Sequence, residues 1–307
     1  MLTVPTHGNF TNDSSYQAGS GKKDAIFSLA HLTLIGCSVP ELVFVAARAG
    51  YDAVSPRFIP MGIPGEFCNY PNDKELVHAT KTALNLTGIA VHEVELARIM
   101  PDCEPKSFVP AMEVGADLGA NRFILSAWMG DNYDRNFVID CYAEACDLAK
   151  PFNLTVDFEF PTFSSVSSLK EAVDIVRSAD RSNCGILIDT IYAYFTELDP
   201  CELDTLPPEW FHFLHISDSP PIWSSSDEEM LYIARDGRLY PGEGCIDFNS
   251  LVKHLPEMTY TIELPNKKRV NELGYEEHVR RALTFAKQAL ASSHPMHGSG
   301  SNYLTQK

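Results

Sequence analysis

The sequence lacks long apolar runs and is poor in positive charge. No apolar segment approaches the ~20 residues that a helix needs to cross a bilayer, so we expect no membrane partner. Its 24 Lys and Arg residues are outnumbered by 41 Asp and Glu residues, which gives a formal net charge of −17. Because such a surface repels phosphate backbones, we expect no nucleic-acid partner either.

Several short motifs are also missing. The eight cysteines contain no C-x-x-C pair, which favours reduced thiols over a disulfide framework. The sequence does not open with a basic segment followed by an apolar one, so we expect no secretory signal and a cytoplasmic location. A G-x-G-x-x-G turn and a phosphate-binding P-loop are absent, which counts against an open, doubly wound nucleotide-binding sheet.

What the sequence does contain is a persistent alternation of short apolar runs with amphipathic segments. We predict polar, flexible arms at residues 1–23 and 293–307 and a single domain at 24–292. Eight strand–helix units in that domain predict an α/β fold, specifically a (β/α)8 TIM barrel, with the doubly wound sheet as the alternative. The predicted strands are 25–34, 51–55, 88–96, 122–126, 154–159, 184–189, 211–215 and 258–263. The predicted helices are 41–49, 73–86, 106–118, 134–150, 167–178, 200–206, 248–254 and 275–291.

Four polar residues each close one of the last four apolar runs. They are Glu159, Asp189, His215 and Glu263. One such residue alone is more often a helix cap, an ion pair or a hydrogen-bonded core residue, but four on consecutive strands are harder to explain as coincidence. If the strands are parallel, the four side chains gather at one rim, where barrel enzymes have their active sites. Three carboxylates and an imidazole there suit one divalent ion, Mn²⁺ first, with Mg²⁺, Co²⁺ or Zn²⁺ as alternatives.

At this point residues 25–291 resemble the xylose-isomerase-like TIM barrels, the sugar phosphate isomerase/epimerase superfamily. The resemblance rests on the Glu…Asp…His…Glu order over the last four strands. His215 and Asp218 form a His-x-x-Asp pair similar to the family's, and residues 241–247 match its Pro-Gly-x-Gly-x-x-Asp segment. One departure is Tyr192, which stands where many members have a histidine after the aspartate of the sixth strand.

The resemblance implies a metal-assisted proton transfer on a sugar-like hydroxy ketone, through a metal-stabilised enediolate. It implies that Glu159 and Glu263 are the acid/base pair, while Asp189 and His215 are mainly ligands. An isomerase or epimerase is the first hypothesis. The alternatives are a dehydratase of a cyclic keto-polyol, such as a dehydroshikimate- or inosose-like compound, and a non-catalytic barrel that binds a small molecule. A homo-oligomer is compatible with such barrels, although no sequence feature fixes the state.

Six further residues near the predicted rim are candidates for substrate binding: His31, Glu95, Trp128, Asp218, Arg235 and Arg238. For several of them a structural role is an open alternative. His31 could be a hydrogen-bonded interior histidine, and Glu95 could form an internal ion pair, for example with Arg98. Either loop arginine could bind a carboxylate or phosphate, or pair at the surface with Asp227 or Glu228. Trp128 could form an apolar wall, as could Trp223, or merely pack a loop.

Overall fold

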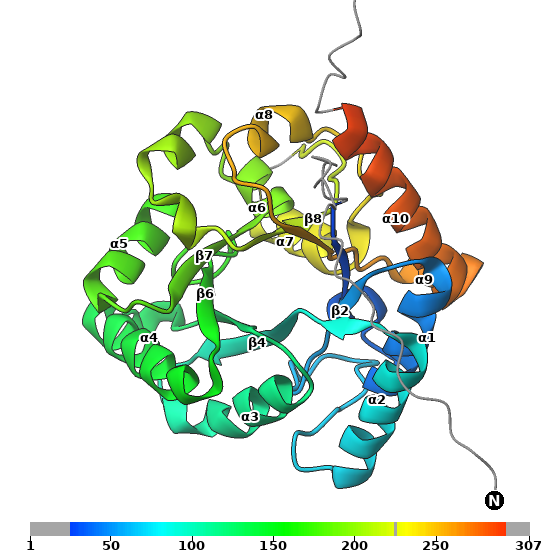
Figure 1. The fold of residues 1–307 in the computed structure, drawn as a ribbon. Helices are drawn as coiled ribbons and strands as arrows, with labels where there is room; N and C mark the ends of the chain where they lie inside the picture. The colour runs from blue at the N-terminus through cyan, green and yellow to red at the C-terminus, as the bar shows by residue number, and fades with distance from the viewer. Residues whose placement is uncertain (1–24, 224–225, 293–307) are drawn as a thin grey trace, which may run out of the picture.

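The computed structural model describes residues 25–223 and 226–292, which form a ring of parallel strands surrounded by helices (Figure 1). This confirms the predicted (β/α)8 barrel, whereas the predicted polar arms lie outside the described residues. The strands are β1 Phe27–Ala30, β2 Ala53–Ser55, β3 Ala90–Val91, β4 Glu93–Ile99, β5 Arg122–Ala127, β6 Thr155–Glu159, β7 Cys184–Asp189, β8 Phe213–Ile216 and β9 Thr259–Ile262. The α-helices are α1 Val39–Ala49, α2 Lys74–Thr87, α3 Val109–Asp117, α4 Arg135–Ala149, α5 Leu169–Ala179, α6 Thr190–Phe195, α7 Asp227–Tyr232, α8 Phe248–Val252, α9 Lys267–Leu273 and α10 Tyr275–Ser292.

The strand order explains how nine strands make an eight-fold barrel. The order is β3-β2-β1-β9-β8-β7-β6-β5-β4, and every neighbouring pair is parallel. The two end strands, β3 and β4, are consecutive in the chain and are separated only by His92, so together they are the third barrel strand. A parallel bridge between Arg57 and Glu95 joins the segment after β2 to β4 and closes the ring.

Two of the three apolar clusters are those expected for a barrel whose interior is filled by side chains. A large cluster lies between the strands and the helices. A small cluster of Ile124, Leu187 and Phe213, with Leu96 packed against it, fills the barrel interior. Because side chains alternate along a strand, Leu187 shares its face of β7 with Asp189. The carboxyl ends of the strands are therefore supported from below by an apolar plug.

Local signals account for several helix boundaries. Asp73 precedes α2 and accepts hydrogen bonds from the backbone N–H groups of Glu75 and Leu76, as an N-cap does. Helix α1 ends at Ala49 and is capped by Gly50, whose φ of 88° is the left-handed conformation that glycine adopts without strain. Helix α5 begins at Leu169, two residues later than the predicted start at 167. Ser168, not Ser167, accepts from the backbone N–H of Glu171.

The first predicted strand, 25–34, was wrong over its second half. β1 ends at Ala30, and His31–Leu34 is a 3-10 helix. The cause is Glu95 on β4, whose carboxylate oxygens accept from the backbone N–H groups of His31 and Leu32 at 3.0 and 3.3 Å. These bonds take the backbone donors that a longer strand would give to its neighbour.

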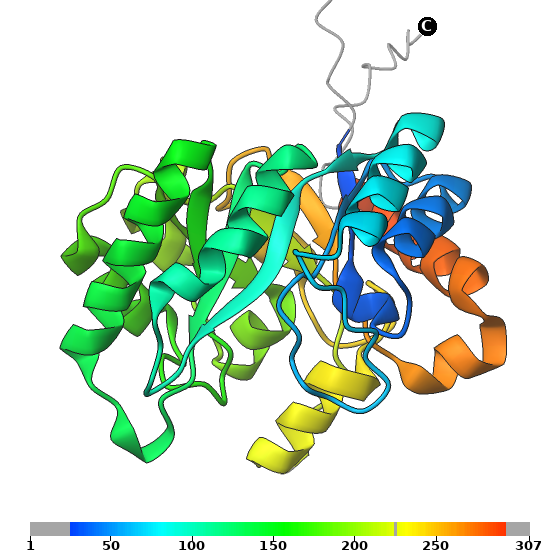
Figure 2. The same ribbon diagram turned by 90° about the horizontal axis from the view of Figure 1, so that it is seen from below.

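Other differences concern short segments after the strands. The helix predicted at 200–206 is a 3-10 helix, Pro200–Thr205. Helices α6, α7 and α9 were not predicted, because each has only six or seven residues and too few turns for a clear period. Helix α7, drawn in yellow, projects from the end of the barrel at which the strands finish (Figure 2). No helix among the described residues is long and apolar enough to cross a membrane.

Candidate metal centre

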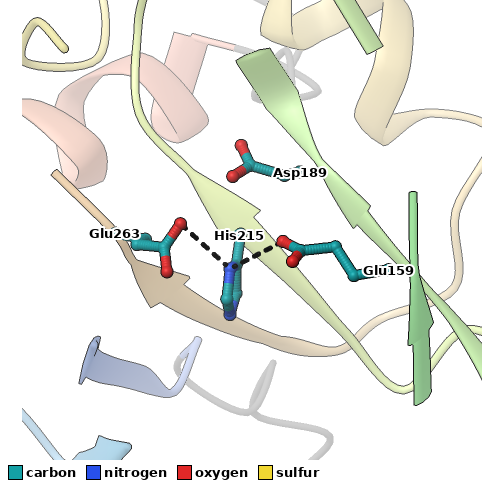
Figure 3. A group of neighbouring side chains, drawn as sticks. All are labelled: Glu159, Asp189, His215 and Glu263. Atoms are coloured by element: carbon teal, nitrogen blue, oxygen red, sulfur yellow. Dashed lines mark ion pairs between the residues drawn. The ribbon is translucent and has the colours of Figure 1, made fainter. Parts of the chain in front are cut away.

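The four residues predicted at the rim come together. Glu159 and Asp189 are the last residues of β6 and β7, His215 lies in β8, and Glu263 directly follows β9. Each offers one ligand atom, and these atoms all lie within 4.8 Å of one another (Figure 3). The Nδ1 atom of His215 is 3.9 Å from Glu159 Oε1 and 3.6 Å from Glu263 Oε2.

The donor set fits a divalent ion. Metal–ligand distances of about 2.0–2.2 Å place opposed ligand atoms at most about 4.4 Å apart, so only a small contraction is needed. His215 is buried, yet neither ring nitrogen has a hydrogen-bond partner among the described residues. A buried polar atom without a partner is costly, and binding to a metal would satisfy Nδ1. Oxygen and imidazole ligands suit Mn²⁺, Co²⁺ or Zn²⁺.

Arg238 holds two of the four carboxyl groups in place. It is completely buried, and its guanidinium donates to Asp189 Oδ2 and Glu263 Oε2, both at 2.7 Å. It also donates to the Ser217 hydroxyl at 3.1 Å and to the Ala234 carbonyl at 2.9 Å. Arg238 therefore contacts the proposed ligands directly, rather than an acidic partner at the surface.

The two glutamates have opposite electrostatic environments. Burial, together with the charge of Glu263, raises the pKa of Glu159 to about 8. Burial also acts to raise the pKa of Glu263, but the positive charges of Arg238 and His215 outweigh it and lower that pKa to about 2. Glu159 is therefore the carboxyl that holds a proton more readily, and Glu263 is the one that stays ionised.

A carboxylate that the sequence did not single out as a ligand partner lies beneath His215. The Nε2 atom of His215 is 3.5 Å from Oε1 of the fully buried Glu93. The other oxygen of Glu93 contacts the Nδ1 atom of His92. A carboxylate behind a histidine ligand fixes the ring orientation. Glu93 thus lies on the Nε2 side of the His215 ring, whereas Glu159 and Glu263 face Nδ1.

Comparison with known proteins agrees with the resemblance seen in the sequence. The family described as "Xylose isomerase-like TIM barrel" matches residues 43–288. The chain belongs to this family. Inosose isomerase of Bacillus subtilis (strain 168) is 24% identical over 127 residues, 40% of this chain and 43% of the relative. A 3-dehydroshikimate dehydratase of Pseudomonas aeruginosa is 30% identical over 82 residues, 27% of this chain and 12% of the relative. The matches thus span less than half of either curated relative.

Solved structures share the fold over most of this family member. A crystal structure of IolI protein with a binding zinc atom superposes with a TM-score of 0.72 at 18% identity, covering 88% of this chain and 100% of that one. D-allulose 3-epimerase from Methylomonas sp., in complex with D-allulose, gives 0.63 at 18% identity, covering 87% and 98%. At these identities the likeness establishes the fold.

In two of the predicted substrate-binding residues, His31 and Glu95, the side-chain polar atoms already have partners within the protein. The Nδ1 atom of His31 accepts from the backbone N–H of Arg57 at 3.1 Å, and Nε2 lies 2.9 Å from the Cys37 carbonyl. This is the hydrogen-bonded interior histidine that the sequence allowed as an alternative. Besides its two backbone bonds, Glu95 accepts from Arg57 Nη2 at 3.0 Å. Its ion-pair partner is thus Arg57, not Arg98.

Asp218 is engaged entirely by backbone. Its oxygens accept from the N–H groups of Ser219 and Ile246 and from those of Gly242 and Gly244, at 2.8–3.0 Å. The side chain is fully buried. Asp218 therefore fixes the Pro-Gly-x-Gly loop and leaves no oxygen free of these bonds. Gly244 is required there, since a Cβ would lie 2.2 Å from the Ser219 carbonyl oxygen.

Aromatic rings line one side of the centre. The Trp128 indole donates to Ser126 Oγ and lies 5.8 Å from the Phe163 ring. Phe163 in turn lies 5.7 Å from Tyr192, whose ring is 5.8 Å from the guanidinium carbon of Arg238. Trp223, by contrast, is 84% exposed and adds nothing to this wall.

Proposed function

We propose that this protein is a divalent-metal-dependent isomerase or epimerase of a sugar-like hydroxy ketone. The observation that carries the proposal is the placement of Glu159 and Glu263, which approach His215 from opposite sides (Figure 3). Moving a proton from one side of a carbon to the other, or between adjacent carbons, needs two acid/base groups that flank it. A structural ion-pair cluster has no need of that arrangement.

Glu159, Asp189, His215 and Glu263 would hold the ion, with Mn²⁺ as our first choice. When bound, it supplies Lewis-acid polarisation of the substrate carbonyl and hydroxyl oxygens, which makes the neighbouring C–H more acidic. The barrel contributes burial, since both glutamates are only 5% exposed. Exclusion of water strengthens the electrostatic interactions at the reacting carbon.

The environments of the two glutamates support different roles for them. Arg238 and His215 keep Glu263 ionised, so it can accept a proton from carbon. Glu159 retains a proton more readily and can return one on the other side. Pairs of carboxyls with pKa values pushed apart are a common basis for acid/base division of labour. We further propose that the Trp128, Phe163 and Tyr192 rings form the wall against which the carbon skeleton packs.

A dehydratase is the second candidate. The 30% identity over 82 residues with a 3-dehydroshikimate dehydratase favours it. The same two glutamates would act, but the returned proton would go to a leaving hydroxyl rather than to carbon. A conjugated product would then absorb in the ultraviolet, whereas an isomerase would give exchange of a C–H proton with solvent deuterium and no new chromophore.

The first experiment measures metal content after incubation with Mn²⁺ and desalting. The samples are the parent, a Glu159→Gln, Glu263→Gln double variant and, as control, Glu276→Gln, whose side chain is exposed. We expect about one ion per chain in the parent and control and a loss in the double variant. Solvent exchange and ultraviolet absorbance on a hydroxy-ketone panel then separate the two reactions. Equal, near-zero metal in all three proteins would refute the proposal and favour a non-catalytic binding barrel.

A further inference from the structure

Arg57 is a buried cation whose hydrogen-bonding capacity is mostly unused. Its side chain is 4% exposed, and Nη2 donates to Glu95 at 3.0 Å. Within the described part of the chain, its Nε and Nη1 atoms have no hydrogen-bond partner. A buried guanidinium left in this state is costly. Arg57 follows β2 at the same end of the barrel as the metal centre. Burial acts to raise the pKa of Glu263, but the positive charges of Arg238, His215 and, more weakly, Arg57 lower it.

Two more arginines lie near Arg57. Arg98, near the end of β4, is half-buried, and its guanidinium donates to the Met61 carbonyl at 3.1 Å. Arg235, in the π-helical turn after α7, forms no hydrogen bond or ion pair with any residue in 25–223 or 226–292. Burial lowers the pKa of Arg98, and so do the positive charge of Arg57 and, more weakly, that of Arg235, whereas the negative charge of Glu66 acts in the opposite direction. Arg98 also lies on β4, three residues after Glu95, which is the ion-pair partner of Arg57, and its hydrogen bond to Met61 places it beside the segment that follows Arg57.

This arrangement is unexpected in so acidic a chain. Asp and Glu outnumber Lys and Arg by 41 to 24, and several arginines elsewhere do have carboxylate partners, for example Arg135 with Asp174 and Arg181 with Asp147. Gathering like charges costs free energy. A ligand anion that accepts from them would recover it, because arginine is suited to bind oxyanions through several donors at once.

We propose that Arg57, Arg98 and Arg235 form an anion subsite beside the metal centre, and that the substrate is a keto-polyol bearing a carboxylate. The inference rests on the proposed function and narrows its substrate class. A carboxylate is favoured over a phosphate because the neighbouring Glu95 and Glu263 repel a dianion more strongly than a single charge. The anionic group would anchor one end of the molecule while its hydroxy-ketone end reaches Glu159 and Glu263.

The test uses the full chain and three cyclic polyol probes in isothermal titration calorimetry, with and without Mn²⁺. Quinate carries a carboxylate, myo-inositol is uncharged, and myo-inositol 1-phosphate carries a phosphate. The variants are Arg98→Gln with Arg235→Gln, and Arg57→Gln separately, because a change at a buried site can also impair folding. Arg135→Gln, on the exposed face of α4, removes the same charge elsewhere.

We expect the parent to bind quinate at least about tenfold more tightly than myo-inositol, and the double variant to lose about tenfold or more of that affinity. Its myo-inositol affinity, and both affinities of the Arg135→Gln control, should be unchanged. Equal affinities for quinate and myo-inositol in the parent, or unaltered quinate binding in the double variant, would overturn the subsite. Tighter, arginine-dependent binding of the phosphate probe would overturn the carboxylate assignment.

These outcomes are independent of the metal measurement. Metal content that depends on Glu159 and Glu263, together with quinate binding that ignores the arginines, would remove the subsite and leave the proposed reaction standing. Arginine-dependent quinate binding by a protein that takes up no metal would leave the anion subsite standing and remove the proposed metal-dependent reaction.

Discussion

Replacing Arg238 by methionine should destabilise the metal-free protein strongly, and the metal-loaded protein less. The guanidinium is buried and makes two 2.7 Å bonds, to Asp189 and Glu263. Its removal leaves both carboxylates without their main counter-charge in a site that water barely reaches. Methionine keeps much of the side-chain length, so the change is chiefly one of charge and hydrogen bonding.

The magnitude follows from the loss of one partner in a buried ion pair, which costs about 3–5 kcal/mol. For a chain of this size, about 2 °C per kcal/mol is a suitable conversion, so the melting temperature should fall by about 6–10 °C. A divalent ion brings positive charge to the same carboxylates. The difference between parent and variant should therefore shrink when Mn²⁺ is present.

The assay is thermal and urea unfolding of parent and variant, each with chelator or with Mn²⁺. Arg135→Met is the matched control, because Arg135 also forms two short bonds to a carboxylate, but on the exposed surface, where ion pairs contribute little. If Arg238→Met were no less stable than this control without metal, the guanidinium would not be the counter-charge of the site. An identical loss with and without Mn²⁺ would mean that metal and Arg238 do not act on the same carboxylates.

Three further predictions concern other parts of the barrel. Gly185→Ala should cost about 1–3 kcal/mol, because its Cβ would lie 2.2 Å from Asp157 Oδ1; unchanged urea unfolding would contradict the packing. Glu93→Gln should weaken Mn²⁺ binding about 10–100-fold in a chelator competition, and an unaltered affinity would show that Glu93 does not orient the His215 ring. Burial lowers the pKa of His278 from 6.5 to about 4, so the unfolded chain takes up this proton first and stability falls as pH drops through that window. His278→Gln should lose less stability between pH 6.5 and 4, by up to about 3 kcal/mol, and an equal slope for both proteins would refute the assignment.

The sequence sufficed for the barrel and for the four gathered side chains for one shared reason. The spacing of apolar residues and the residues that begin and end helices are local properties of the sequence, and they mark where each strand ends. In a parallel barrel all strand ends meet at one rim, so Glu159, Asp189, His215 and Glu263 could be brought together without knowing a single distance. The prediction of adjacency needed topology alone.

Partners inside the barrel could not be obtained in the same way. Arg235 and Arg238 stand three residues apart in one loop. Arg235 is half-buried and forms no ion pair with the residues that the structure describes, whereas Arg238 is buried against Asp189. Arg235 lies within the π-helical turn Ile233–Gly237, and Arg238 directly follows it. Glu93 and Glu95 could be placed on one face by their spacing, but the sequence did not show that Glu95 pairs with Arg57.

What the sequence by itself determined is therefore the architecture and the positions at which chemistry can occur, since both follow from periodicity along the chain. Only the tertiary structure decided which charged residues pair with one another and that both ring nitrogens of His31 have partners. It also decided that Arg57 is buried with Nε and Nη1 unpartnered among the described residues. The physical reason is that a side chain's partners are set by contacts between residues far apart in sequence, such as Arg238 with Asp189, 49 positions away.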